Sequence, residues 1–253
     1  MTLHTQIKGQ GKTIVILHGF LGMGDNWKSI SNELAKNYEV HLPDMRNHGK
    51  SGHSQDLNYE VMVEDMREYF NTHQIEDAVL IGHSMGGKIA MQFAAEYPQY
   101  LSHLIVVDIS PKYYHPHHDD ILESLKLLKS KKLTSRQDAD EVLKAKIEQQ
   151  GVRLFLLKNL NREDDNTLSV KPNVEVFLEN RDEIGRALPE SCRYKGPTLF
   201  IKGENSAYIR ARDSKLIDQH FPNHKIVSVE NAGHWVHAEN PKSFLEKTLE
   251  FVR

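Results

Sequence analysis

Cysteine is nearly missing from this sequence. Cys192 is the only cysteine among 253 residues, so the chain cannot form an internal disulfide. This excludes the small secreted domains that disulfides hold together, and it suits a reducing compartment. Because no activating neighbour of the thiol is evident, we expect Cys192 to be a small buried or half-buried residue and not a nucleophile.

Long apolar runs and a dominant charge are also missing. The first residues, MTLHTQIKGQGK, have no apolar signal core, and the run TIVIL that follows is too short to span a bilayer. The 32 basic and 35 acidic residues nearly balance, which leaves a formal net charge of -3. We therefore expect a cytoplasmic location, no membrane span and no nucleic-acid partner.

The sequence does contain short β-branched runs that alternate with helical patterns. Such alternation is typical of a parallel sheet with crossover helices, and the length suits one large core. Two helices are expected, over Tyr59 to His73 and over Gly86 to Tyr97. The expected strands span residues 13–19, 39–44, 78–84, 104–110, 197–203 and 225–231.

One segment interrupts this alternation. From residue 112 to 188 we find amphipathic helix patterns and no convincing strand. Asp119 or Asp120 is a candidate N-cap of one helix, and Ser135 with Asp138 resembles a capping arrangement before another. We expect a core of residues 1–111 and 189–253, with residues 112–188 as an inserted helical lid over the carboxyl ends of the strands.

The motif GHSMG follows a predicted strand and opens a predicted helix. It is a G-x-S-x-G sequence in the strand–turn–helix setting of a nucleophile elbow, with Ser84 at its apex. Gly82 and Gly86 permit a turn too tight for larger residues. The backbone N–H of Met85 is expected at the helix N-terminus, where it can face an oxyanion.

A serine nucleophile needs a base. The segment NAGHWVHAE places His234 in a glycine-containing loop just after the last predicted strand, on the same sheet edge as Ser84. His237 is the alternative, although its position at a helix start favours a surface or packing role. A second oxyanion donor is expected from LHGFLG, at the backbone N–H of Phe20, unless these glycines only shape a tight connection.

Together these motifs resemble the α/β-hydrolase superfamily over essentially the whole chain. The segment DMRNHGKSGH matches the superfamily pattern D-x-R-x-H-G-x-S, while GHSMGG, VVDISP and AGHWVHAE resemble the bacterial esterases of the YbfF type and the related ABHD-eleven hydrolases. The resemblance implies an α/β-hydrolase fold, with a mostly parallel central sheet, flanking helices and an inserted lid. It also implies a serine esterase that acts on an acyl ester or thioester and needs no cofactor.

The third triad member departs from the common pattern. Many members of the superfamily carry the acid as G-x-x-D, but the corresponding segment KGENSAYI has Ser206 at that position. Asp108, at the carboxyl end of the strand after the elbow helix, is the expected acid, as in the YbfF-like group. Glu204 remains an alternative, and Asp108 could instead cap a turn before Pro111. In the triad, Asp108 would orient the imidazole of His234 and stabilise its cation.

Further residues are assigned supporting roles. Asp44, Arg46 and His48 are expected to brace the oxyanion loop by buried hydrogen bonds. The expected lining of an acyl pocket is Phe155, Leu156, Phe177 and Trp235, although the lid residues could equally hold the lid on the core. Arg153 and Lys158 could meet an acidic substrate, but helix-surface charge is the simpler interpretation.

Two alternatives to an esterase are considered, as well as a metal site. Carbon–carbon bond hydrolases and a menaquinone-pathway lyase share the elbow and the HGFLG loop, but they normally keep the acid that Ser206 replaces. A non-catalytic ligand-binding hydrolase fold is disfavoured by the intact serine, histidine and oxyanion loops. The crowded histidines of YYHPHHDD, residues 113–120, suggest a metal, yet Pro116 interrupts them and they lack helical pairing, so we expect none.

Overall fold

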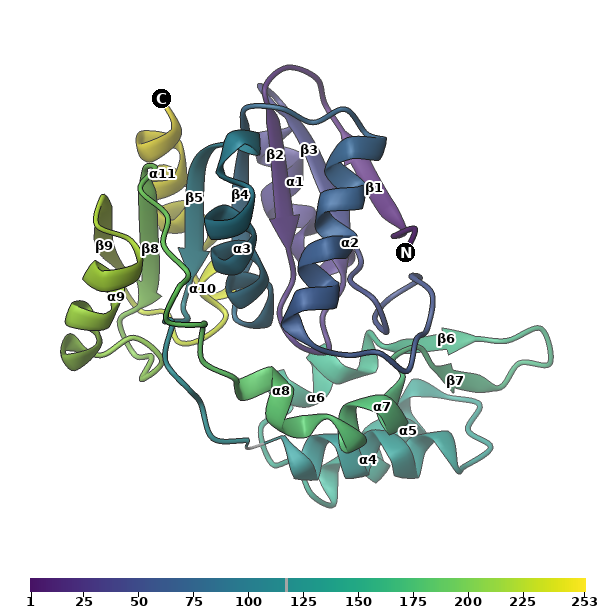
Figure 1. Ribbon diagram of the computed structural model, residues 1–253. Coiled ribbons are helices and arrows are strands. Elements are labelled where there is room, and N and C mark those ends of the chain that lie inside the picture. The colour runs from purple at the N-terminus through teal and green to yellow at the C-terminus, as the bar shows by residue number, and fades with distance from the viewer. Residues whose placement is uncertain (117) are drawn as a thin grey trace.

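The computed structural model describes residues 1–116 and 118–253. Its centre is a seven-stranded sheet with the order β1-β3-β2-β4-β5-β8-β9 (Figure 1). The strands are β1 (Thr5–Lys8), β2 (Thr13–Leu17), β3 (Glu39–Pro43), β4 (Ala78–His83), β5 (Leu101–Val107), β8 (Thr198–Gly203) and β9 (His224–Val229). Each expected strand is present, and all pair in parallel apart from β1.

Strand β1 was not expected from the sequence. It pairs antiparallel with β3 at the sheet edge, and its four residues TQIK contain one large apolar side chain, Ile7, which is exposed. An edge strand with one exposed face lacks the continuous apolar run that marks the buried strands. In contrast, every residue of β4 is buried, as its sequence AVLIGH indicates.

Helices cover both faces of the sheet (Figure 1). One face packs against α2, α3 and α9, and the other packs against α1 and α11, so that each face has its own apolar core. The helices are α1 (Lys28–Leu34), α2 (Tyr59–Thr72), α3 (Met85–Glu96), α9 (Ser214–His220), α10 (Val236–Glu239) and α11 (Pro241–Val252). Short 3-10 helices span Gly24–Trp27, Pro98–Tyr100 and Ala211–Asp213.

Residues 112–188, which we call the lid segment, form a layer at the carboxyl ends of the strands (Figure 1). Its elements are α4 (Asp119–Lys129), α5 (Arg136–Lys144), α6 (Gln150–Leu157), β6 (Leu160–Arg162), β7 (Leu168–Val170), α7 (Val174–Glu179) and α8 (Arg181–Gly185). The expectation of a strand-free lid is wrong, because β6 and β7 form an antiparallel hairpin. These strands are three residues long, which is too short for an alternating apolar pattern to predict them. The turn between them contains Asn166 with a positive φ angle.

Of the two helix N-caps predicted in the lid segment, that of α5 is confirmed and that of α4 is wrong. Ser135 is the N-cap of α5, where its hydroxyl accepts the N–H of Asp138. The N-cap position of α4 is His118, so Asp119 and Asp120 lie in the first turn, where their charges still favour the helix dipole.

Two expectations from composition can also be compared with the structure. Cys192 is buried, and burial raises the pKa of its thiol to about 11, which keeps it protonated and inert. Across the residues that the structure describes, no helix combines the length and the apolar character that crossing a membrane requires.

Candidate active site

Ser84 occupies a strained turn between β4 and α3. Its φ angle is 53°, in the left-handed region that residues with a side chain rarely adopt. The turn depends on its glycines, since a Cβ on Gly82 would lie 2.3 Å from the carbonyl oxygen of Gly86. A Cβ on Gly86 would in turn lie 2.5 Å from the carbonyl oxygens of Leu17 and His18. Strand, turn and helix therefore hold Ser84 at the edge of the sheet, where its side chain lines a pocket.

Asp108 occupies a similar turn at the end of the neighbouring strand, β5. Its φ angle is 50° and its side chain is fully buried. Nδ1 of His234 lies 2.8 Å from Asp108 Oδ2, and the N–H of Gly203 donates to Oδ1 at 3.1 Å. The hydroxyl of Ser206 also donates to Oδ2. The carboxylate is thus held by three donors, one of which is the imidazole.

The other candidate acid points elsewhere. Glu204 is exposed, and its Oε2 accepts the N–H of Asn231 at 2.9 Å. Ser206, which stands where a G-x-x-D pattern would place the acid, donates its hydroxyl to the carboxylate of Asp108. The geometry therefore pairs His234 with Asp108 and leaves Glu204 outside this group.

The loop that carries His234 is fixed by hydrogen bonds to its backbone. His83 Nε2 donates to the carbonyl oxygen of His234 at 2.8 Å. The carboxylate of Glu239 accepts the N–H groups of Gly233 and Trp235 at 2.6 and 3.2 Å. Burial and the neighbouring histidines hold the pKa of His83 well below its ordinary value, so the ring stays neutral. The sequence showed His83 only as part of the elbow motif and gave no sign of this contact.

His237 lies apart from the Asp108 carboxylate. Its ring stacks on Trp27 with centroids 3.8 Å apart. Burial, followed by the nearby His234 and Lys158, lowers the pKa of His237 to about 3, so its imidazole is neutral near pH 7. This environment matches the packing role expected for it.

The two expected oxyanion donors flank the serine. Met85 is the first residue of α3, and Phe20 lies in the loop after β2. Neither backbone N–H donates to another residue within 1–116 and 118–253. The Phe20 loop lies directly against the elbow, since a Cβ added to Gly19 would be 3.3 Å from Cβ of Ser84. N–H groups without such a partner, one in the elbow and one in the loop against it, can stabilise an oxyanion.

His18 holds the Phe20 loop in place. The N–H of Met45 donates to His18 Nε2 at 2.9 Å, so Nδ1 carries the proton and donates to the carbonyl oxygen of Gly19 at 2.8 Å. Burial lowers the pKa of His18 and favours this neutral form. The sequence did not identify this role, because it depends on a contact between the loops after β2 and β3.

Of the three DMRNHG residues that were expected to brace the oxyanion loop by hydrogen bonds, only Asp44 bonds to a residue near that loop within the part of the chain that the structure describes. Asp44 Oδ1 accepts the N–H of Gly24, near the end of the Phe20 loop, at 2.7 Å. Arg46 pairs with Asp65 of α2 at 2.6 Å, so it ties the segment to α2 and does not reach the loop directly. His48 Nδ1 donates to the carbonyl oxygen of Arg46 at 2.8 Å.

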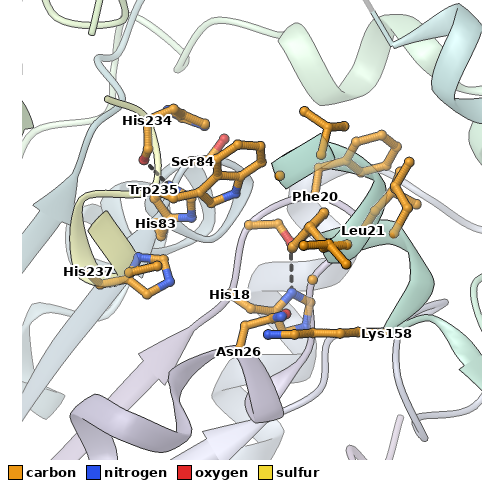
Figure 2. Close-up of a pocket in the computed structure, with 18 of the residues that line it drawn as sticks. His18, Phe20, Leu21, Asn26, His83, Ser84, Lys158, His234, Trp235 and His237 are labelled. Carbon is orange, nitrogen blue, oxygen red and sulfur yellow. Dashed lines mark hydrogen bonds between the residues drawn. The ribbon is translucent and has the colours of Figure 1, made fainter. Parts of the chain in front are cut away.

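A pocket of about 510 Å³ opens beside Ser84 and His234 (Figure 2). Three of the expected lining residues, Phe155, Leu156 and Trp235, form part of its wall. Phe177 does not line it, since its ring is fully buried and packs edge-on against Phe20 with centroids 4.9 Å apart. A helix pattern identifies an apolar residue but not whether it faces a cavity or the core.

The two basic lid residues differ in environment. Lys158 lines the pocket (Figure 2). Arg153 was expected on the helix surface but is buried, with Nε 2.8 Å from Asp140 and Nη1 bonded to the carbonyl oxygens of Ile147 and Glu148. These three hydrogen bonds all lie within the lid segment.

A metal site finds no support among the described residues. No group of three or more histidine, cysteine, aspartate or glutamate side chains within them could hold a metal ion. The YYHPHHDD segment includes residue 117, which lies outside the described residues.

Comparison with known proteins agrees with this fold. The model of the alpha/beta hydrolase fold family matches residues 12–241. Escherichia coli esterase YbfF is 32% identical over 94% of this chain and 91% of its own, and the Danio rerio sn-1-specific diacylglycerol lipase ABHD11 is 36% identical over 97% and 80%. A solved structure of a marine microorganism esterase is 40% identical with a TM-score of 0.94, covering 98% of each chain. The chain therefore belongs to the alpha/beta hydrolase fold family.

Proposed function

We propose that this chain is a serine carboxylic ester hydrolase that cleaves an acyl ester or thioester through an acyl-serine intermediate. The observation that carries the proposal is the 2.8 Å contact between His234 and the buried carboxylate of Asp108, with His234 and Ser84 lining one pocket. The esterase and lipase names of similar proteins support the same reaction class.

Acylation begins with the hydroxyl of Ser84. As its oxygen attacks the carbonyl carbon, Nε2 of His234 takes the hydroxyl proton. The negative charge moves to the carbonyl oxygen, where the N–H groups of Phe20 and Met85 stabilise it. Collapse of this intermediate breaks the bond to the alcohol or thiol, which leaves with the proton from the imidazolium.

Deacylation repeats these steps with water. His234 removes a proton from water, the hydroxide adds to the acyl carbon, and the proton returns to Ser84 as the acid is released. In both halves Asp108 keeps the proton on Nδ1, so that Nε2 is free to act as the base, and its charge stabilises the imidazolium. None of these steps needs a metal or cofactor.

The lid supplies the substrate-facing wall in this proposal. Phe155 and Leu156 of α6 face the pocket together with Trp235 of the core. This apolar wall suits the hydrocarbon part of a small-molecule ester, and its burial would contribute about 25 cal/mol per Å² of apolar surface.

The function is tested with Ser84→Ala. Removing the hydroxyl of the half-buried Ser84 costs the fold little, but turnover of short acyl esters should fall by about 10⁴-fold or more. A fluorophosphonate probe should label the native protein at Ser84, as identified by peptide mass spectrometry, and should not label the variant. Substantial ester hydrolysis by pure Ser84→Ala would refute the serine mechanism, and a native protein that neither labels nor hydrolyses esters would favour a ligand-binding role.

A further inference from the structure

Two tyrosine rings form a stack between the lid and His234. The ring of Tyr208 lies on the imidazole of His234, with centroids 3.9 Å apart and planes 15° from parallel. The ring of Tyr114 stacks on Tyr208 at 5.3 Å and 27°. Tyr208 follows β8 in the core, whereas Tyr114 lies in the segment that enters the lid. The imidazole is therefore connected to the lid through two aromatic side chains.

The backbone of Tyr208 is held from both sides. Its N–H donates to Ser206 Oγ at 3.2 Å, and the hydroxyl of Ser206 donates to the carboxylate of Asp108. On the opposite side, the hydroxyl of Tyr114 donates to the carbonyl oxygen of Tyr208 at 2.7 Å. The position of the ring thus depends on both the acid and the lid.

Tyr114 is itself anchored where the two ends of the lid meet. Its N–H donates to the carbonyl oxygen of Gly185, near the end of the lid, at 2.8 Å. The buried Lys88 of α3 donates to the carbonyl oxygens of Lys112 and Arg186, one at each end of the lid, at 2.5 and 2.8 Å. Lys88 Nζ also lies 5.2 Å from the centre of the Tyr114 ring. The elbow helix thereby fixes the base of this stack.

The stack of Tyr208 on His234 restricts rotation of the imidazole ring, and the proposed chemistry requires that this ring keep its orientation. For His234 to serve Ser84, its ring must keep Nδ1 on Asp108 while Nε2 accepts and returns a proton. A plane in contact with one face of the imidazole opposes rotation of that ring. The negative face of an aromatic ring also attracts the imidazolium that forms during turnover.

We propose that Tyr208 is a positioning residue for His234, and that its contact with Tyr114 makes the orientation of the imidazole depend on the docking of the lid. This proposal rests on the proposed function. It assigns Tyr208 no part in bond making or breaking, only the placement of the imidazole.

The test compares Tyr208→Leu with Tyr208→Phe on a 4-nitrophenyl acetate assay. Leucine removes the flat ring, so kcat should fall by about 10- to 100-fold while KM changes by less than about threefold, because a misplaced base costs rate and not binding. Phenylalanine retains the stack and should stay within about threefold of the native kcat. The control is Tyr113→Leu, an exposed neighbour of Tyr114, which should leave both constants unchanged.

A spectroscopic readout separates positioning from a general loss of structure. The His234 Nδ1 proton, bonded to Asp108, should give a low-field NMR signal in the native protein and in Tyr208→Phe. The same signal should be broadened or lost in Tyr208→Leu. Tyr114→Phe, which removes the hydroxyl that bonds Tyr208, should lower kcat by about 3- to 10-fold.

Three results would overturn the proposal: a native kcat in Tyr208→Leu, equal losses in the leucine and phenylalanine variants, or an unchanged low-field signal in a slow Tyr208→Leu. A native Tyr114→Phe would overturn the dependence on the lid. In each case the proposed function would stand as long as the native protein hydrolyses the ester and Ser84→Ala does not.

Discussion

Ser84 and Asp108 both have a positive φ angle, and they lie at the ends of adjacent strands. Their φ angles are 53° and 50°, and β4 and β5 pair in parallel with each other. Each strand therefore ends in a sharp turn at the same edge of the sheet, and His234 enters from the loop after β9. An acid in the turn after β5, as proposed, lies one strand away from the turn after β8, and the hydroxyl of Ser206 links the two turns.

Replacing the acid tests this assignment. Asp108→Asn keeps the side-chain shape but cannot stabilise the imidazolium and can favour the wrong imidazole tautomer, so kcat should fall by about 10²- to 10⁴-fold. Glu204→Gln should have little effect, because Glu204 bonds the backbone of Asn231. Both variants would be assayed on a short acyl ester, with circular dichroism as the control for folding.

The opposite outcome would reassign the acid. A crippled Glu204→Gln beside a folded, active Asp108→Asn would show that the acid is Glu204. Adding Ser206→Asp to the Asp108→Asn variant tests whether a carboxylate in the turn after β8 can orient the same histidine, His234. Recovered turnover would show that two neighbouring strand ends are equivalent for this purpose.

At the scale of elements, the pattern of apolar residues predicted the strands and helices that are stabilised by packing in the core. The buried runs gave β4 and β5, and the helical period gave α2 to within one residue at its end. The edge strand β1 and the β6–β7 hairpin were missed. These short strands have exposed residues and no apolar pattern of their own, because they are held by pairing, β1 with the distant strand β3 and β6 with β7 across a turn. The helices of the lid were expected, but the pocket-facing side of each helix was not determined by its own sequence.

Helix α6 gives a prediction about substrate choice. Phe155 is half-buried in the pocket wall, 5.6 Å from the ring of Trp235. In Phe155→Ala, kcat/KM for an octanoate ester should fall by about 10-fold, whereas that for an acetate ester should change by less than about twofold, because only a long chain reaches the missing ring. Leu127→Ala, an exposed lid residue on α4 outside the pocket lining, is the matched control. Equal losses for both esters would make α6 a structural support and not a specificity element.

Across the whole molecule, the candidate site depends on contacts between distant parts of the chain. His234 and Asp108 are 126 residues apart, and His18 meets the N–H of Met45 from 27 residues away. Motifs predicted Ser84 and His234 as site residues because their local settings are distinctive. They could not indicate the contacts of His18, His83 and Tyr208, because these contacts form only when separate loops meet at one sheet edge.

Buried histidines are a second property of the whole molecule. Burial lowers the pKa values of His18, His48, His83 and His237, that of His237 from 6.5 to about 3. These four rings lie around the candidate site and its oxyanion loop. In the unfolded chain each would titrate near its ordinary value, so the unfolded state binds more protons below about pH 6.5.

Stability should therefore fall as the solution is acidified. A group whose folded pKa is lowered stabilises the fold above its unfolded pKa, and this contribution is lost as the pH falls toward the folded pKa. Between pH 7 and pH 5 the loss for His237 should be about 2 kcal/mol, and His18, His48 and His83 act in the same direction. Burial opposes ionisation of Glu60, but its hydrogen bond to Arg186 lowers the pKa of this carboxyl overall. Such carboxylates change the stability mainly below pH 5.

Urea unfolding between pH 7 and pH 5 should show a free energy of unfolding that falls with the pH. The variant His237→Phe, which keeps a ring on Trp27, should show a shallower slope. A free energy that stays constant from pH 7 to pH 5 would mean that these imidazoles titrate normally in the folded protein.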